Sequence, residues 1–361
     1  MRIEVLTGRR SLSTISLLIL IGFLVLGPAI GIFLGRSWAE EPEEGSPEYY
    51  MKLANQGDAD AQYTVANMYR KGEGVTKDPV EGAKWMRKAA ENGNIDAQCN
   101  MAWLYDTGEG VQQDYAEAVK WYRKAADAGD SVAQFNLGWM YDNGSGVQQD
   151  YAEAVKWYRK AAEAGHASAQ VTLGWMYENG RRVQQDYAEA VKWYRKAADA
   201  GDLVAQYNLG IMYRYGRGVQ QNDAEAVKWF RKAAEAGYSS AQDHLGGMYD
   251  EGRGVQQNDA EALKWYRKAA AQGNSFGQAN LGVMFYSGRG VIQDWKLALK
   301  YYRLSAEQGN RTAQYNLGLM YEHGEGVKKD LVEAKKWFSK AAEQGDEDAK
   351  ARLKDLEGMK P

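Results

Sequence analysis

The stretch SVAQFNLGWMYDNGSGVQQDYAEAVKWYRKAAEAGH, residues 131–166, decides the fold because its pattern returns every 36 residues along the chain. Its Ala-Gln pair marks the copies, at residues 61–62, 97–98, 133–134, 169–170, 205–206, 241–242 and 313–314, with Gly277-Gln278 in the remaining place. A fixed period of about 20–50 residues is typical of a solenoid or array. The sequence therefore predicts eight full repeats, over residues 59–94, 95–130, 131–166, 167–202, 203–238, 239–274, 275–310 and 311–346, with a half-repeat at each end.

The first half of each repeat predicts a helix. Ala133, Leu137, Met140 and Tyr141 are spaced as one face of a helix. Gly144 follows, and glycine at this point suits a left-handed helix end. The same position is glycine in all eight repeats, from Gly72 to Gly324.

The second half predicts another helix. Asp150 with Glu153 three residues later is the pattern of an N-cap with a capping box. The cap position is Asp or Asn throughout: Asp78, Asp114, Asp150, Asp186, Asn222, Asn258, Asp294 and Asp330. The tryptophan of this helix recurs almost without change, which predicts a core position at Trp85, Trp121, Trp157, Trp193, Trp229, Trp265 and Trp337.

These residues carry a resemblance. The pattern A-Q-x-x-L-G-x-M-Y-x-x-G-x-G-V…D-x-x-E-A-x-K-W-Y-x-K-A-A-x-x-G resembles the Sel-1-like repeat family, whose fold is similar to that of tetratricopeptide repeats. The resemblance implies an all-α fold, an α/α-solenoid wound as a right-handed superhelix over residues 48–356, followed by a short tail at 357–361. Local departures at Arg182, Gly277, Leu297 and Tyr301 indicate a slightly altered stack near repeats four and seven, without a change of fold.

The N-terminus has a different character. No charge occurs between Arg10 and Arg36, and about 20 apolar residues suffice to span a bilayer. We therefore predict a short cytoplasmic N-terminus at 1–10, a transmembrane signal-anchor at 11–36 and an acidic linker at 37–47. The alternative is a signal peptide cleaved near Ala39. Arginines before the segment and glutamates after it predict export of the repeats, as a single-pass protein of a bacterial inner membrane facing the periplasm, or as a secreted or periplasmic protein after cleavage.

Residues suited to catalysis are few. The single cysteine, Cys99, excludes an intramolecular disulfide and a cysteine-based zinc site, and the three histidines are not spaced as ligands. A net charge of −3 offers no basic field for nucleic acid. The nucleophile motif Ser-x-x-Lys of penicillin-interacting enzymes does not occur. We predict no enzyme activity, cofactor or metal; a hydrolase such as a β-lactamase-like enzyme is a remote alternative.

Function is expected where the repeats differ. By resemblance to tetratricopeptide folds, the residue after Leu-Gly faces a concave groove, where it is tryptophan in repeats two, three and four. The predicted partner-binding residues are Trp103, Trp139, Trp175, Phe135, Tyr207, Asp106, Asp142 and Glu178. Two alternatives remain: packing between neighbouring first helices, and a tryptophan inherited by duplication, since repeats two to four share the run VQQDYAEAVKWYRKAA.

The tryptophans Trp103, Trp139 and Trp175 and the acids Asp106, Asp142 and Glu178 recur at the same two positions of successive repeats and suit two kinds of ligand. Tryptophan is a frequent hot-spot residue of protein interfaces, and acids pair with lysine and arginine. The resemblance likewise implies an adaptor that assembles protein partners. The alternative is an envelope polysaccharide or peptidoglycan, whose sugar rings stack on flat aromatic side chains.

Overall fold

A computed structural model describes residues 42–358 of the chain. The predicted N-terminus at 1–10, the anchor at 11–36, linker residues 37–41 and residues 359–361 lie outside the described part. Within that part, no helix is long and apolar enough to cross a membrane. The described helices all belong to one unit of the chain, which begins at Glu43.

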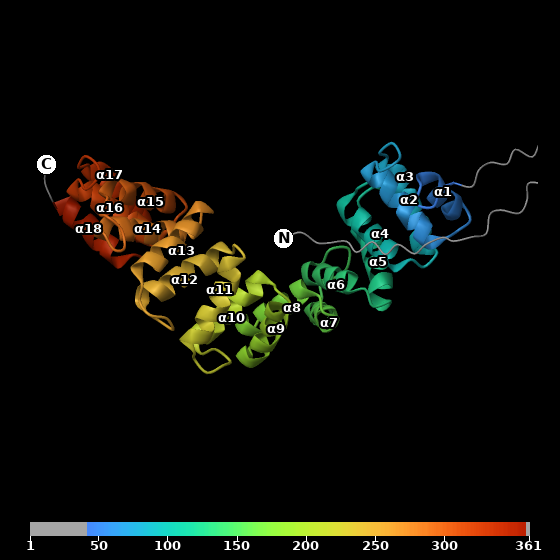
Figure 1. The fold of residues 1–361 in the computed structure, drawn as a ribbon, viewed down its shortest axis with the longest axis horizontal. Helices are drawn as coiled ribbons and strands as arrows, with labels where there is room; N and C mark the ends of the chain where they lie inside the picture. The colour runs from blue at the N-terminus through green and yellow to red at the C-terminus, as the bar shows by residue number, and fades with distance from the viewer. Residues whose placement is uncertain (1–41, 359–361) are drawn as a thin grey trace, which may run out of the picture. The chain divides into compact units, whose positions relative to one another are not determined.

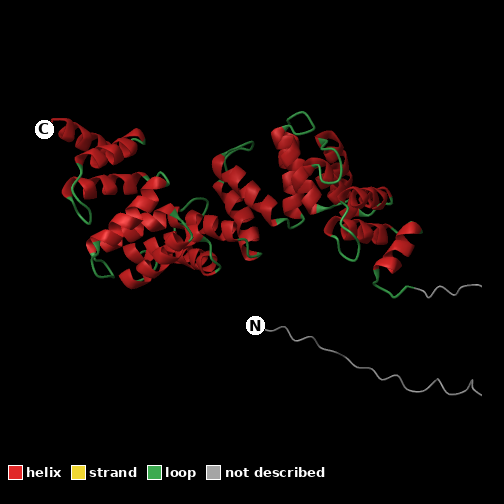
Figure 2. Cartoon of the chain, turned by 90° about the horizontal axis from the view of Figure 1, so that it is seen from above, coloured by secondary structure: helices red, strands yellow, loops and turns green. Residues whose placement is uncertain are grey.

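Every regular element among the described residues is an α-helix, as predicted (Figure 2). The helices are α1 (Pro47–Asn55), α2 (Ala59–Lys71), α3 (Pro79–Glu91), α4 (Ile95–Thr107), α5 (Tyr115–Asp127), α6 (Ser131–Asn143), α7 (Tyr151–Glu163), α8 (Ala167–Asn179), α9 (Tyr187–Asp199), α10 (Leu203–Tyr215), α11 (Asp223–Glu235), α12 (Ser239–Glu251), α13 (Asp259–Ala271), α14 (Ser275–Ser287), α15 (Trp295–Glu307), α16 (Arg311–His323), α17 (Leu331–Glu343) and α18 (Glu347–Gly358).

Each helix packs chiefly against the helices directly before and after it in the sequence. The pairs α2–α3 to α16–α17 are the eight predicted repeats, with α1 and α18 as the flanking half-repeats, and they succeed one another from blue to red in Figure 1. Contacts restricted to neighbours are the defining property of a solenoid. The predicted helical solenoid is therefore confirmed for the described residues.

The predicted helix ends are confirmed. The Asp150 carboxylate accepts hydrogen bonds from the backbone N–H groups of Ala152 and Glu153, at 2.9 and 3.0 Å. Asp or Asn caps all eight second helices: the side chain accepts two backbone N–H bonds in five of them, and one in the helices capped by Asn222, Asn258 and Asp294. Gly144 ends α6 with φ 71°, in the left-handed region. These caps satisfy backbone groups that a helix end leaves without partners.

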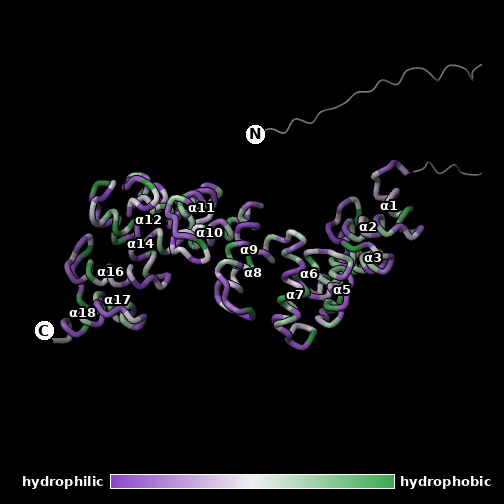
Figure 3. Tube along the Cα trace, turned by 90° about the horizontal axis from the view of Figure 1, so that it is seen from below, coloured by the Kyte–Doolittle hydropathy of each residue, from purple (hydrophilic) through white to green (hydrophobic). Residues whose placement is uncertain are grey.

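The core runs along the array between the two helices of each repeat. Leu137 and Met140 of α6 are buried against α7, where Trp157 is 2% exposed. The seven second-helix tryptophans are between 2% and 8% exposed, which confirms their predicted core position. A lysine three residues later covers the outer face of each indole, as Lys160 does at 4.0 Å from the Trp157 ring centre. Figure 3 shows the resulting alternation of apolar and polar segments along the helices.

Two recurring residues of the repeat have structural reasons that the helical pattern alone does not show: the glutamine of all eight repeats, and a mid-helix glycine of repeats three to eight that is alanine in the first two. The Gln134 side chain donates to the carbonyl of Ala126 at 3.1 Å and so ties α6 to the preceding helix α5. Gly138 lies in mid-helix under the Tyr158 ring, where a Cβ atom would come within 2.9 Å of the ring. Unlike Gly144 at the end of α6, this glycine allows α6 and α7 to approach closely.

Arg182 departs from the repeat at a position that is otherwise glycine. Its φ is 66°, and it is the one described residue other than glycine with positive φ. Its guanidinium forms an ion pair with Asp142 and lies 4.4 Å from the Tyr151 ring centre. These contacts to the preceding repeat offset the unfavourable backbone conformation, and repeat four keeps both of its helices, α8 and α9.

Candidate protein-binding surface

Three tryptophans stand on the surface of successive first helices. Trp103 of α4, Trp139 of α6 and Trp175 of α8 are 36%, 44% and 40% exposed. Trp139 lies two positions after the buried Leu137, and a helix turns about 100° per residue, so its side chain faces away from the core. We call these three residues the tryptophan row.

The three indoles differ in their surroundings. The Arg70 guanidinium, from the preceding repeat, lies 5.1 Å from the Trp103 ring centre, and that of Arg181 lies 5.2 Å from Trp175. Among the described residues, no cation lies over Trp139. Trp139 is therefore the most open of the row, while the other two each have a cation over the ring.

The predicted acidic row is largely occupied by contacts between repeats. Asp142 pairs with Arg182 of the next repeat. Glu178 accepts a hydrogen bond from the Tyr194 hydroxyl at 2.8 Å and pairs with Arg217 at 3.5 Å. Two of the three acids thus bind neighbouring side chains of the array.

Asp106 is different, because no ion pair to it occurs within residues 42–358. The corresponding contacts elsewhere join residues 39 positions apart: Arg70 with Glu109, Glu178 with Arg217, Asp250 with Arg289, and Tyr286 with Glu325. The residue 39 positions after Asp106 is Ser145, which carries no charge. Partial burial raises the pKa of Asp106, and no neighbouring cation opposes this effect among the described residues. A cation supplied by a partner would stabilise the carboxylate. Because it lacks an ion pair in this part of the chain, Asp106 is the acid of the three best placed to accept such a cation.

Burial also raises the pKa of Asp142, and the charges of Arg182 and Arg181 act in the opposite direction. Arg182 thus compensates part of the desolvation of this carboxylate. An arginine 39 or 40 residues after the acid is a signal in the sequence. Asp142 has Arg182 and Glu178 has Arg217 at this distance, whereas Asp106 has only uncharged residues there.

Phe135 and Tyr207 lie half-buried in contacts between helices. The Phe135 ring stacks on His166 at 4.9 Å and is tilted against Tyr158 at 5.5 Å. Tyr207 packs edge-on against Tyr238 at 5.5 Å and His244 at 5.0 Å. The structure therefore separates these two side chains from the exposed tryptophan row.

Several exposed aromatic residues lie outside the predicted set, and Tyr215 is the one nearest to the tryptophan position of its own repeat. Tyr215, at the end of α10, is 53% exposed. The guanidinium groups of Arg214 and Arg217 lie 5.6 and 5.4 Å from its ring centre. It stands four positions after Ile211, the counterpart of Trp139 in repeat five, and this helical spacing could have indicated it.

The arrangement favours binding over chemistry. Exposed indole faces and one unpaired carboxylate can contact apolar and cationic groups of a partner. No group of histidine, cysteine, aspartate and glutamate side chains within the described range is arranged to hold a metal ion.

Asp243, in the same helix position as Phe135, predicts a pH effect on stability. Burial raises its pKa to about 6 from 3.8, against the hydrogen bond from Asn280 and the charge of Arg214. The folded protein thus holds this proton to a higher pH than the unfolded chain, so stability is lost as pH rises from about 4 to 6. We expect Asp243→Asn to raise the free energy of unfolding at pH 7 by about 2 kcal/mol.

Urea unfolding of both proteins at pH 4 and pH 7 checks this effect. The Asn280 amide, 2.8 Å from Asp243 Oδ1, can still donate to the asparagine oxygen. The gain should therefore be small at pH 4 and full at pH 7. An equal gain at both pH values would contradict a role for deprotonation of Asp243.

Comparison with known proteins agrees with this geometry. The family model for the Sel1 repeat matches residues 59–94, 95–130, 131–166, 167–202, 203–238, 239–274, 275–310 and 312–346. No curated protein matches the chain.

Two crystal structures are similar over most of the chain. A protective antigen of uropathogenic Escherichia coli with an SLR fold is 43% identical, with a TM-score of 0.80, over 85% of this chain and 66% of that protein. A Sel1 repeat protein from Oxalobacter formigenes is 35% identical, with a TM-score of 0.68, over 86% of this chain and 89% of that one. The chain belongs to the Sel1 repeat family.

Proposed function

We propose that the chain is a non-enzymatic adaptor, which binds partner proteins through the tryptophan row of α4, α6 and α8. The observation that carries the proposal is the exposure of three indoles at the same position of three successive repeats. Exposed tryptophans of this size are costly to leave in water and are enriched at interface hot spots. A segment with apolar side chains for the indoles and a Lys or Arg for Asp106 fits this surface.

The proposal includes a location. The uncharged segment between Arg10 and Arg36 supports a membrane anchor, and the charges that flank it support an extracytoplasmic repeat domain. A reporter fused after Pro361 tests this topology. Activity of a reporter that works only outside the cytoplasm supports export, and activity of a cytoplasmic reporter alone contradicts it.

Replacing Trp103, Trp139 and Trp175 together by alanine tests the surface. We expect crosslinked partners of the full-length chain to be lost, with affinity for a purified partner falling by a factor of about 100. Stability should change by less than about 0.5 kcal/mol for each exposed side chain. Pull-down with quantitative mass spectrometry measures the loss.

Trp295→Ala is the matched control, because Trp295 is 42% exposed and lies outside the row. This control should keep every partner. A triple variant that folds normally and also keeps every partner contradicts the proposed surface.

A polysaccharide or peptidoglycan is the second candidate ligand, because open indole faces also stack on sugar rings. Envelope glycans should then change the tryptophan fluorescence of the wild type but not of the triple variant. A glycan response together with unchanged protein partners would favour this candidate over the adaptor.

A further inference from the structure

The outer face of α15 differs from the same face of its seven sister helices. In each of those helices, the glutamate at the third position forms an ion pair with the lysine three residues later. The pairs are Glu81–Lys84, Glu117–Lys120, Glu153–Lys156, Glu189–Lys192, Glu225–Lys228, Glu261–Lys264 and Glu333–Lys336. In α15 the glutamate is replaced by Leu297, so Lys300 has lost this partner.

Two further replacements change the same face. Lys296 stands where α7 has Ala152, and Leu304 stands where α7 has Lys160, the lysine that covers the Trp157 indole. One acid is lost, one cation has moved to the start of the helix, and an apolar side chain is newly exposed. Lys296 and Lys300 have no ion-pair partner within the described residues.

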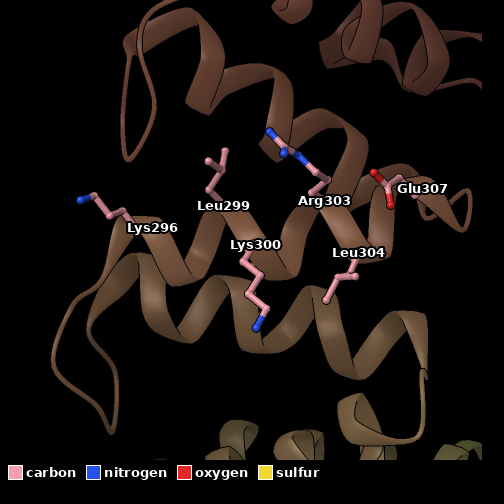
Figure 4. A pocket seen from close by; sticks show the side chains of 6 residues that line it. All are labelled: Lys296, Leu299, Lys300, Arg303, Leu304 and Glu307. Atoms are coloured by element: carbon pink, nitrogen blue, oxygen red, sulfur yellow. The ribbon is translucent and has the colours of Figure 1, made fainter.

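These changes surround a shallow hollow of about 240 Å³, lined by Lys296, Leu299, Lys300, Arg303, Leu304 and Glu307 (Figure 4). Arg303 donates to the Tyr321 hydroxyl and is thereby held in place. Leu299 is half-buried and Leu304 is exposed. The hollow thus combines two leucine side chains with two ammonium groups that have no ion-pair partner among the described residues, although Lys300 lies 5.9 Å from the Tyr301 ring centre.

We propose that this face, the α15 face, docks an acidic segment of a partner protein, independently of the tryptophan row. Carboxylates of the segment pair with Lys296 and Lys300, and an apolar side chain of the segment rests against Leu299 and Leu304. Charge complementarity selects an anionic occupant, since the sister helices neutralise the corresponding lysine internally. A hollow accepts a protruding side chain, whereas a membrane surface offers none, so a peptide fits better than a bilayer.

A labelled peptide of four alternating Glu-Leu pairs is the probe, and its fluorescence anisotropy with the full-length chain measures binding. We expect binding that weakens as salt is added, because the pairs are exposed to solvent. The double variant Lys296→Gln and Lys300→Gln should bind about tenfold more weakly, as the loss of two exposed ion pairs implies.

The matched control is Lys156→Gln with Lys192→Gln, which removes the same charge from two sister helices. It should change the affinity less than about twofold, because those lysines already pair with Glu153 and Glu189. Leu304→Ser should also weaken binding, although it changes no charge. Circular dichroism checks that each variant folds.

The proposal is overturned by equal weakening in the two double variants, by equal binding of a Gln-Leu peptide, or by no binding of the Glu-Leu peptide. Phosphatidylglycerol vesicles bound in preference to the peptide would assign the α15 face to a membrane and would also overturn it. Since the Trp103/Trp139/Trp175 variant leaves α15 intact, it should bind the peptide normally.

Discussion

Replacing Trp157 by alanine is expected to lower the free energy of unfolding by about 4 kcal/mol, the cost of truncating a large buried aromatic side chain. Trp157 is 2% exposed between α7 and the neighbouring helices. Removing the indole leaves a cavity between repeats and deprives Lys160 of the ring that it covers. Urea unfolding followed by circular dichroism measures the loss.

Trp139→Ala provides the comparison for this prediction. Both tryptophans belong to the same repeat, but Trp139 is 44% exposed. Its replacement should change the free energy of unfolding by less than about 0.5 kcal/mol. Equal losses for Trp139 and Trp157 would contradict the distinction between a packing tryptophan and a contact tryptophan.

Replacing Gly146 by alanine is expected to cost about 3 kcal/mol, because two penalties combine there. Its φ of 69° is unfavourable for alanine by about 1 kcal/mol. A Cβ atom would also lie 2.2 Å from the carbonyl oxygen of Tyr115 in the preceding repeat. Relief of this overlap requires the two repeats to move apart, which costs about 2 kcal/mol more.

Gly165→Ala separates the two penalties of Gly146→Ala. Gly165 has φ 93°, but no atom lies within 4 Å of its added Cβ. Its replacement should therefore cost only about 1 kcal/mol. The melting temperatures of both variants measure the difference, and an equal cost would show that the contact between repeats contributes nothing.

Much of the fold could be predicted because its determinants are local. The Asp150 cap, the glycine after α6 and the spacing of Leu137 and Met140 act within one or two helical turns. The same caps and spacing recur in all eight repeats, which makes the prediction of each helix more secure. Gly138 could not be explained in this way, because its reason is the Tyr158 ring of the partner helix.

The candidate surface could be predicted only in part. The exposure of Trp139 follows from its place on the helix opposite to Leu137, and the tryptophan row is where the spacing indicated. Whether each acid of this surface has an ion-pair partner depends on the side chain about 39 residues further along the chain. Asp142 and Glu178 find an arginine there, and Asp106 does not.

The sequence by itself determined the helices, their caps, the eight repeats and the split between buried and exposed tryptophans, because these depend on spacing along one chain segment. Only the tertiary structure decided which exposed groups remain free to bind. Within residues 42–358, it brings Arg182 to Asp142, His166 to Phe135 and no cation to Asp106 or Trp139. The physical reason is that a side chain is available for binding only when no neighbouring helix supplies a partner for it. The packing of successive helices determines which side chains become neighbours.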